Sequence, residues 1–178
     1  MEIDDCTKRD VIAEVFDRVR DYVNPDAPIE SLCLPHAFLT IEALRARGHR
    51  AILQAGSASW RYLHPNLDDG VTATHFSYMW APEDPRSIEA IREYRMPEVH
   101  VWVATTDPLE LVDLTTGHQV AQARRLAGIA WTAEPPGPYL WGLPPRGMMY
   151  RPYERATMLA LEVAVTLIGI RRTMALVS

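Results

Sequence analysis

The stretch that decides the fold is CLPHAFLTIEALRARG, residues 33–48. Its apolar residues recur at helical spacing, which predicts a helix from about Leu34 to Arg47 that is buried on most of its surface. Pro35 suits the first turn, because a backbone nitrogen there has no hydrogen bond to lose. Gly48 follows the end of the helix, where a C-terminal cap is expected. The stretch opens with a cysteine, so a thiol stands at the entrance of a buried helix.

Cys33 lies where unpaired backbone amides and the positive end of the helix dipole favour a thiolate. Reactive cysteines in such settings have pKa values lowered from about 8.5 to roughly 3.5–7.5, especially beside a protonated histidine. The same amides can donate hydrogen bonds to the oxyanion that forms when a carbonyl is attacked. Cys33 is therefore a candidate nucleophile, whereas a cysteine without chemical partners is more often a buried structural residue.

Two strand-like segments further along supply an imidazole and a carboxylate. Val99 to Ala104 and Leu109 to Leu114 are separated by Thr105-Thr106-Asp107-Pro108, which predicts a hairpin with a four-residue loop. Pairing the two residues that flank this loop places His100 directly opposite Asp113, with Cβ atoms about 4.5–5.5 Å apart on one face. A loop one residue longer or shorter would put them on opposite faces.

Together, Cys33, His100 and Asp113 are the residue types that an acyl-transfer site needs. In such a site a thiolate attacks, an imidazole moves protons and a carboxylate orients the imidazole. The three can meet if the sheet packs on the cysteine-bearing helix. Trp102 and His36 are candidate substrate-binding residues. In the alternative interpretations, Trp102 packs over the His-Asp pair and shields it from water, and His36, one turn from the thiol, is the rival base.

Composition narrows the class of protein. The 178 residues and their net charge of −5 are typical of one domain without a nucleic-acid-binding surface. Two cysteines, Cys6 and Cys33, cannot form the disulfide framework of a small secreted protein. The N-terminus has no apolar segment with a basic lead-in and cleavage site, so we expect a cytoplasmic protein. The chain contains neither HExxH nor CxxC spacing, and we expect no metal site.

The remaining segments are predicted as short strands, a loop and further helices. Helical spacing predicts helices at Thr7 to Val23, Gln119 to Leu126 and Pro152 to Arg171. Strands are expected at Ala51 to Ala55, Trp60 to Leu63 and His75 to Trp80. The proline- and aromatic-rich segment 134–152 is expected to be an ordered loop, which either packs over the core or forms one wall of a substrate groove. The last helix is too short for a confident membrane span, and it suits burial or a homodimer contact.

In this order, these residues resemble those of the transglutaminase-like (papain-like) cysteine enzyme superfamily. The likeness covers about Leu32 to Gly117. It comprises the cysteine-initiated helix ending in Ala46-Arg47-Gly48-His49-Arg50-Ala51, the strand after it, the His100-x-Trp102 strand and the Val112-Asp113-Leu114-Thr115 strand. Cys33-Leu34-Pro35 and the helix after it also look like the leader peptidases of lasso-peptide biosynthesis.

The resemblance implies an α+β fold in which the cysteine-bearing helix packs on an antiparallel sheet, here with an extra C-terminal helix, and it implies no metal or organic cofactor. It assigns Cys33 as nucleophile, His100 as base and Asp113 as orienting acid. The substrate would be an amide or isopeptide bond of a peptide or protein. Hydrolysis is favoured over transamidation or deamidation of protein glutamine. Upstream of the cysteine, Asn24 is the only side-chain amide, so no second oxyanion donor is evident there.

A non-catalytic binding protein that retains the same fold is the alternative from another functional class. Such a protein would use the proline- and aromatic-rich segment or the last helix as an interface. In either class the expected partner is a peptide or protein, and neither nucleic acid nor a membrane is expected.

Overall fold

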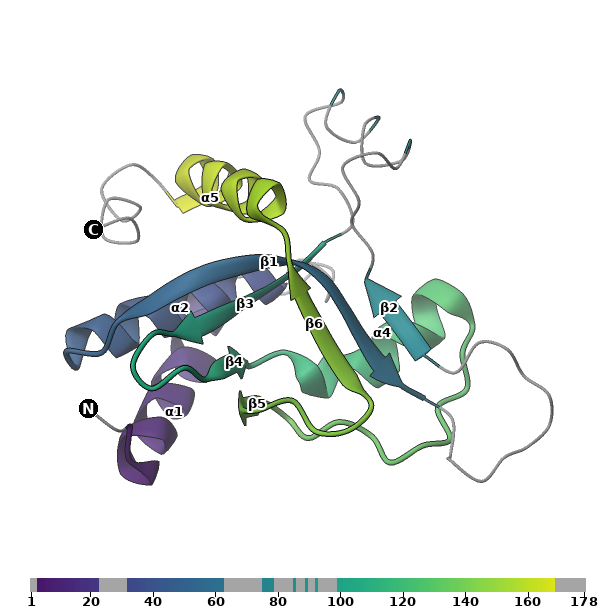
Figure 1. The fold of residues 1–178 in the computed structure, drawn as a ribbon, viewed down its shortest axis with the longest axis horizontal. Helices are drawn as coiled ribbons and strands as arrows, with labels where there is room; N and C mark the ends of the chain where they lie inside the picture. The colour runs from purple at the N-terminus through teal and green to yellow at the C-terminus, as the bar shows by residue number, and fades with distance from the viewer. Residues whose placement is uncertain are drawn as a thin grey trace.

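A long strand, β1 (Ala51–Arg61), lies at the centre of the fold, and other strands pair with both of its edges (Figure 1). The structure is a computed structural model that describes residues 3–22, 32–62, 75–78, 85, 89, 92 and 99–168. Its fold class is α+β, as predicted, with helices packed against a curled antiparallel sheet. The other strands are β2 (His75–Tyr78), β3 (His100–Thr105), β4 (Leu111–Asp113), β5 (Leu140–Gly142) and β6 (Met148–Pro152).

Gly56, near the middle of β1, marks the point where the sheet divides. It pairs with His100 of β3 and with Pro152 of β6, so these two strands occupy opposite edges of β1. Ala58 pairs with β6 and with β2 in the same way, so β2 and β3 lie end to end along one edge. The sheet continues from β3 to β4 and then to β5. A short turn carries the chain from β5 to β6, so both ends of the sheet are tied together and the sheet curls.

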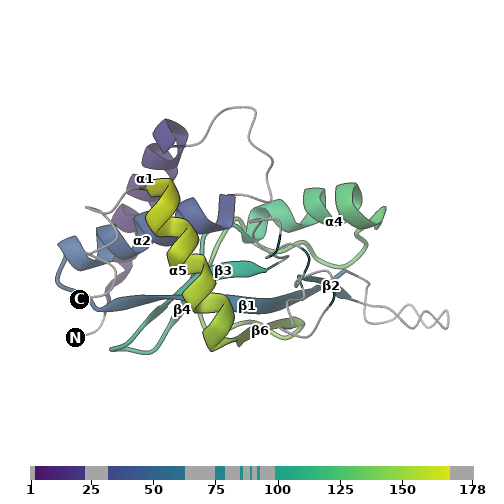
Figure 2. The same ribbon diagram turned by 90° about the horizontal axis from the view of Figure 1, so that it is seen from above.

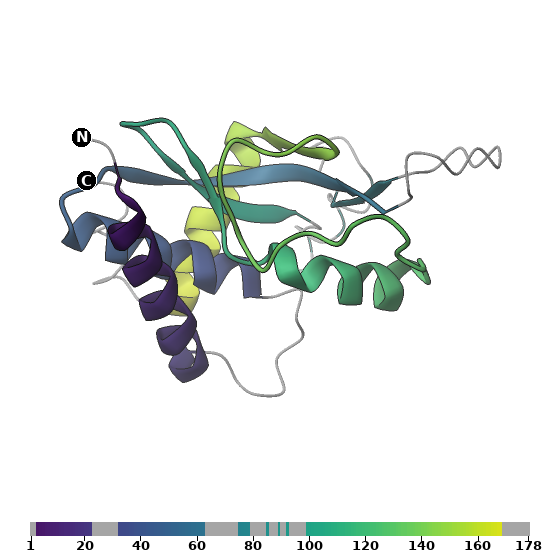
Figure 3. The same ribbon diagram turned by 90° about the horizontal axis from the view of Figure 1, so that it is seen from below.

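The helices on the sheet are α1 (Asp5–Tyr22), α2 (Cys33–Ala46), α4 (Gln119–Ala127) and α5 (Glu154–Ile168), with a short 3-10 turn η2 (Thr116–His118) before α4. Figures 2 and 3 show α1, α2 and α4 on the same side of the sheet, with α1 packed on the outer side of α2. As predicted, α2 is buried on most of its surface. Its buried residues are Leu34, His36, Ala37, Phe38, Leu39, Thr40, Ile41, Ala43 and Leu44.

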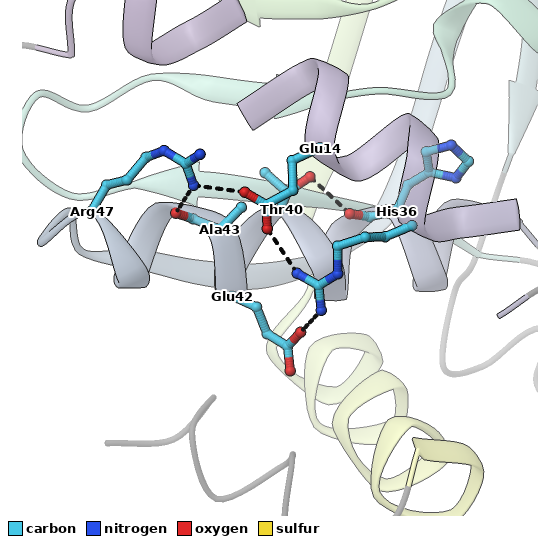
Figure 4. Close-up of polar contacts among 7 residues, drawn as sticks. Glu14, His36, Thr40, Glu42, Ala43 and Arg47 are labelled. Carbon is cyan, nitrogen blue, oxygen red and sulfur yellow. Dashed lines mark hydrogen bonds and ion pairs between the residues drawn. The ribbon is translucent and has the colours of Figure 1, made fainter. Parts of the chain in front are cut away.

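Ion pairs between charged side chains connect α1 with α2 (Figure 4). Glu14 of α1 accepts hydrogen bonds from Arg18 of its own helix at 3.0 Å and from Arg47, at the end of α2, at 2.8 Å. Arg18 also reaches Glu42 of α2 at 2.5 Å. These side chains are about one-fifth to one-third exposed, so each ion pair contributes at most about 1 kcal/mol. The network therefore orients the two helices, while apolar burial supplies most of the stabilisation.

The last helix packs through small residues. Ala156, Ala160 and Ala164 are fully buried, and their spacing of four places them on one face of α5, which lies against β1. The hydroxyl of Thr157 accepts a hydrogen bond from the Ala55 amide at 3.0 Å. The predicted start of this helix at Pro152 is wrong, because Pro152 is the last residue of β6 and pairs there with Gly56 of β1. Positions after 168 lie outside the described residues, and within the described ranges no helix is long and apolar enough to span a bilayer.

The predicted hairpin register is also wrong. Val103 pairs with Val112, and the Thr105 amide donates to the Glu110 carbonyl at 2.9 Å. The loop is therefore 106–109, and the register is displaced by two residues from the prediction. The hydroxyl of Thr105 accounts for the difference, because it accepts a hydrogen bond from the Glu110 amide and thereby draws Thr105 into the strand.

Other element boundaries differ from the prediction in a systematic way. The two strands predicted between positions 51 and 63 are one continuous strand, because residues 56–59 all pair with β6 and all but Ser57 also pair along the opposite edge. The segment 134–152, expected to be a loop, contains β5 and β6. In each case pairing with a distant strand overrode a weak local preference.

Candidate active site

Cys33 is the first residue of α2, and the residue is half-buried and forms no disulfide. The residue before it, Leu32, offers no side-chain hydrogen bond to the helix. The first-turn amides of α2 are therefore not capped by a side chain at that position, which leaves backbone donors at the helix end that carries the thiol. The structure thus places the predicted nucleophile where an oxyanion could be stabilised.

His100 and Asp113 form a buried pair. His100 is the first residue of β3 and Asp113 the last residue of β4, and each is 2% exposed. The His100 Nε2 atom lies 2.7 Å from Asp113 Oδ2. The observed register puts Trp102, rather than His100, opposite Asp113, so the prediction of direct opposition is corrected. A displacement by two residues keeps the same face, and the pair meets along a diagonal.

The thiol of Cys33 lies within hydrogen-bonding range of the His100 imidazole. Because Nε2 is engaged by Asp113, Nδ1 is the ring nitrogen that remains for the sulfur. Both residues stand at the beginning of their elements, so the thiol and the imidazole meet where α2 and β3 start. The structure therefore brings together Cys33, His100 and Asp113, the three residues predicted to act together.

The charges within the site reinforce one another. Burial alone would lower the pKa of His100, but the Asp113 carboxylate and its hydrogen bond, with the Cys33 thiol, raise that pKa to about 10. Burial would likewise raise the pKa of Asp113, but His100 and the hydrogen bonds from Thr115 lower it to about 2. Each group therefore favours the charged form of the other, so at neutral pH the pair is an imidazolium facing a carboxylate.

Asp113 is held on all sides. Its Oδ1 atom accepts hydrogen bonds from the Thr115 amide at 2.8 Å and from the Thr115 hydroxyl at 2.6 Å. Its Oδ2 atom accepts one from the Tyr150 hydroxyl at 2.8 Å in addition to that from His100. Burial and the nearby carboxylate raise the pKa of Tyr150 well above its ordinary value, so the phenol stays a donor. The carboxylate therefore has one orientation, which fixes the imidazole in turn.

Aromatic rings enclose the imidazole. Trp102 stacks on His100 with ring centroids 6.1 Å apart, and Trp60 meets it edge to face at 5.1 Å. Tyr150 closes the group at 6.1 Å from His100. The Trp102 indole donates to the Gln54 side chain at 2.9 Å, and the residue is 1% exposed. Trp102 thus lies over the His100–Asp113 pair and keeps water from it.

His36 is nearby but is engaged elsewhere. Its Nδ1 atom lies 2.8 Å from the Leu32 carbonyl, to which it donates, and burial lowers its pKa. Its ring packs edge to face on Phe16 of α1 at 5.6 Å and lies 6.4 Å from His118. No carboxylate among the described residues hydrogen-bonds to His36, so it lacks the orienting acid that His100 has.

Gln119, the first residue of α4, was not singled out from the sequence. It is 1% exposed, and neither its side-chain oxygen nor its nitrogen has a hydrogen-bond partner in the described part of the chain. One turn further along α4, Ala123 packs in one cluster with Trp60, which contacts His100. A buried amide without partners is costly, and such groups mark candidate functional positions.

Two contributors to the site were thus missed from the sequence: Tyr150 and Trp60. Each is brought to the site by an element that is distant from the hairpin along the chain. The alternation of Trp60 with Ala58 in a strand was a usable signal for an inward-facing ring, whereas nothing local connected Tyr150 with Asp113.

No family model, curated protein or solved structure matches this chain. What the site can do therefore follows from its own geometry. Across the described ranges, no group of three or more His, Cys, Asp or Glu side chains is arranged to hold a metal ion.

Proposed function

We propose that the protein is a thiol-dependent enzyme of the transglutaminase-like (papain-like) type, and that it cleaves an amide or isopeptide bond of a peptide or protein. The observation that carries the proposal is the buried His100–Asp113 pair at 2.7 Å with the Cys33 thiol in range of the same imidazole. An ordinary structural cysteine needs neither an imidazole nor a buried carboxylate beside it.

In the first step, the Cys33 thiolate attacks the carbonyl carbon of the substrate, and the carbonyl oxygen takes the negative charge. Amides at the start of α2 donate to that oxyanion. The His100 imidazolium then gives its proton to the amide nitrogen, the carbon–nitrogen bond breaks, and an amine leaves. What remains is an acyl group bound to the sulfur as a thioester.

In the second step, water attacks the thioester carbon while neutral His100 takes a proton from it. The carbon–sulfur bond then breaks, the carboxylic acid product leaves, and the thiolate–imidazolium pair is restored. Asp113 stabilises the imidazolium and fixes its orientation in both steps. An amine in place of water would give transamidation. The likeness to leader peptidases favours water as the acceptor.

Alkylation of Cys33 by iodoacetamide tests the thiolate–imidazolium pair without a known substrate. In a Cys6→Ser background, we expect fast labelling that persists well below pH 7. His100→Ala should confine labelling to pH values near 8.5, where an ordinary thiol ionises. His36→Ala is the matched control, because it removes a buried histidine of α2 and should leave the profile unchanged. If the Cys6→Ser protein with His100 intact were labelled slowly, with a rise only near pH 8.5, the proposal would be refuted and a binding protein would be favoured.

Turnover is then sought on a mixture of peptides by mass spectrometry, with and without a primary amine. Hydrolysis produces fragments with free carboxyl groups, whereas transamidation adds the mass of the amine. Cys33→Ala should abolish both products, and His100→Ala should lower the rate by about 10²–10⁴-fold, as expected for loss of a general base. An active His100→Ala protein together with an inactive His36→Ala protein would reverse the assignment of the base.

A further inference from the structure

A cavity of about 470 Å³ lies next to the catalytic group, and none of the steps above uses it. Trp60 is fully buried behind one of its walls and contacts the His100 ring at 5.1 Å. One side chain therefore separates the cavity from the imidazole. Its size falls within the range of about 300–1,000 Å³ that is typical of ligand sites.

The cavity walls combine rigid apolar surface with positive charge. Besides Trp60, the lining includes Pro135, Pro136, Pro145, Arg61 and Arg146. Prolines have few conformations to lose, so a wall built from them costs little entropy when a ligand binds. These walls come from the segment 134–152, which the sequence analysis considered as one side of a substrate groove.

Arg61 supplies the most informative atom of the lining. Its Nε atom is buried and has no hydrogen-bond partner among the described residues. Its side chain passes against the backbone of Gly147, where an added Cβ would lie 3.1 Å from the Arg61 Cβ. A buried donor of a charged group without an acceptor is costly, and a carboxylate is the acceptor whose shape and charge match a guanidinium.

The charge balance of the cavity points in the same direction. Arg61 and Arg146 line it, and neither forms an ion pair with a residue that the structure describes. Glu134 is the acidic residue of the lining, and it is exposed. Among the described lining residues one positive charge is in excess, on a chain whose net charge is −5. An anionic group would therefore be drawn to this cavity rather than to the surface at large.

We propose that this cavity is a substrate subsite that takes the carboxylate side chain of a glutamate or aspartate close to the bond that is cleaved. The inference rests on the function proposed above and names the substrate class: peptides with an acidic residue near the scissile bond. Arg61 binds the carboxylate, Arg146 adds charge at the rim, and the prolines pack on the methylene groups.

Peptidyl acyloxymethyl ketones, which alkylate an active-site thiol after binding, test the subsite. Two pairs of probes place glutamate or its neutral isostere glutamine either next to the reactive ketone or one residue before it. We expect the glutamate probe to alkylate Cys33 at least about tenfold faster than the glutamine probe at one of the two positions, as one charge-assisted hydrogen bond allows. Ratios within about twofold at both positions would overturn the inference.

Variants then assign the preference to the cavity. Arg61→Gln should bring the ratio of the two rates close to one, and Arg146→Gln, on an exposed turn, should lower it in part. Arg124→Gln is the matched control, since it removes an exposed arginine of α4 that does not line the cavity. If Arg61→Gln does not fold, the inference is tested by the glutamate-to-glutamine rate ratios of the wild type and of Arg146→Gln. A preference that survives both substitutions would place the carboxylate elsewhere.

Iodoacetamide separates failure of the subsite from failure of the proposed function. This small reagent needs no subsite, so its rate with Cys33 should be the same in the wild type and in both arginine variants. Fast iodoacetamide labelling with equal glutamate and glutamine rates would leave the thiol chemistry standing and remove the acidic specificity. Slow labelling by every reagent would remove the proposed function itself.

Discussion

Asp113 shows how a buried charge is tolerated at the level of one residue. A desolvated carboxylate is costly unless it is paired and hydrogen-bonded. Here it accepts hydrogen bonds from the Thr115 amide, the Thr115 hydroxyl and Tyr150, and it faces the His100 imidazole. Every oxygen of the carboxylate is therefore engaged, and rotation of the group would break several contacts at once. The orientation of the imidazole is held as a consequence.

Tyr150→Phe removes one of these hydrogen bonds without changing the size of the ring. We expect the free energy of unfolding to fall by about 1–2 kcal/mol, because a bond to a charged acceptor is lost while the other bonds persist. Cys33 alkylation at pH 6 should slow by less than about tenfold, since the His100–Asp113 pair remains. Urea unfolding and iodoacetamide rates measure both effects.

Tyr139→Phe is the control for that change, because Tyr139 is 40% exposed and its hydroxyl should contribute little. An unfolding free energy and an alkylation rate for Tyr150→Phe that equal those of the control would show that the hydroxyl does not help to hold Asp113.

At the level of elements, β1 organises the site. Before Gly56 its most buried positions are 51, 53 and 55. From Gly56 onward they include 56, 58 and 60. The partner strands also change at this point, because β3 pairs with residues 51–56 and β6 with residues 56–60, so the buried positions before and after Gly56 have different neighbours. His100, which pairs with Gly56, lies at the switch. Trp60 beyond it then faces the imidazole.

Gly56→Ala tests whether the crossing of β1 and β6 positions the site. An added Cβ at Gly56 would stand 2.1 Å from the backbone oxygen of Arg151, and backbone atoms cannot yield as a flexible side chain can. We expect a loss of at least about 2 kcal/mol in the free energy of unfolding, as for severe overpacking. Alkylation of Cys33 at pH 6 should slow because β6 carries Tyr150.

Gly137→Ala is the matched control for the added methyl group, since its nearest contact would be an ordinary 3.5 Å. Thermal and urea unfolding of the two variants give the comparison. A Gly56→Ala protein as stable as Gly137→Ala would mean that β6 can move away from β1 at little cost.

At the level of the whole molecule, the curl of the sheet creates the site. In a flat sheet, β6 and β4 would be three strand spacings apart, about 14 Å. In the folded protein the Tyr150 hydroxyl of β6 lies 2.8 Å from the Asp113 carboxylate of β4. The rings of Trp60, Trp102 and Tyr150 fill the space between. The His100–Asp113 pair is therefore shielded from water on the side of these rings, and its electrostatics depend on the complete fold.

This coupling predicts how stability varies with pH. The folded-state pKa of His100 is about 10 against an ordinary 6.5, so between these values the folded protein holds a proton that the unfolded chain has released. The free energy of unfolding should therefore fall as the pH rises from 7 to 9.5, by up to about 1.4 kcal/mol per unit. The lowered pKa of Asp113 contributes stability that is present above about pH 4 and is lost as the pH falls toward 2.

Asp113→Asn should remove most of both dependences, because the asparagine neither titrates nor attracts a proton to His100. His36 and His118, whose pKa values are lowered by burial, act near pH 6.5 and below, so the range above pH 7 isolates the pair. Asp10→Asn, at an exposed position of α1, is the control. Parallel pH profiles of wild type and Asp113→Asn in urea unfolding would contradict a buried imidazolium.

The local features could be predicted from the sequence. Helical spacing and the terminal glycine defined α2, and a hydroxyl-rich break between two apolar segments defined the β3–β4 hairpin. An even displacement of register keeps residues on the same face, so the sequence placed His100 and Asp113 together despite the error in their exact pairing. The position of Cys33 at the start of a buried helix could also be predicted, because capping and burial patterns depend on neighbours within a few residues.

The surroundings of these three residues depend on the three-dimensional fold. The merging of two predicted strands into β1, the strands within 134–152, the approach of Tyr150 to Asp113 and the cavity beside Trp60 all depend on contacts between residues far apart in the chain. Such contacts follow from the twist and closure of the sheet, which sum small rotations over many strand pairs. A short stretch of sequence cannot predict the total rotation, because the direction of each strand depends on the partner strands on both of its edges.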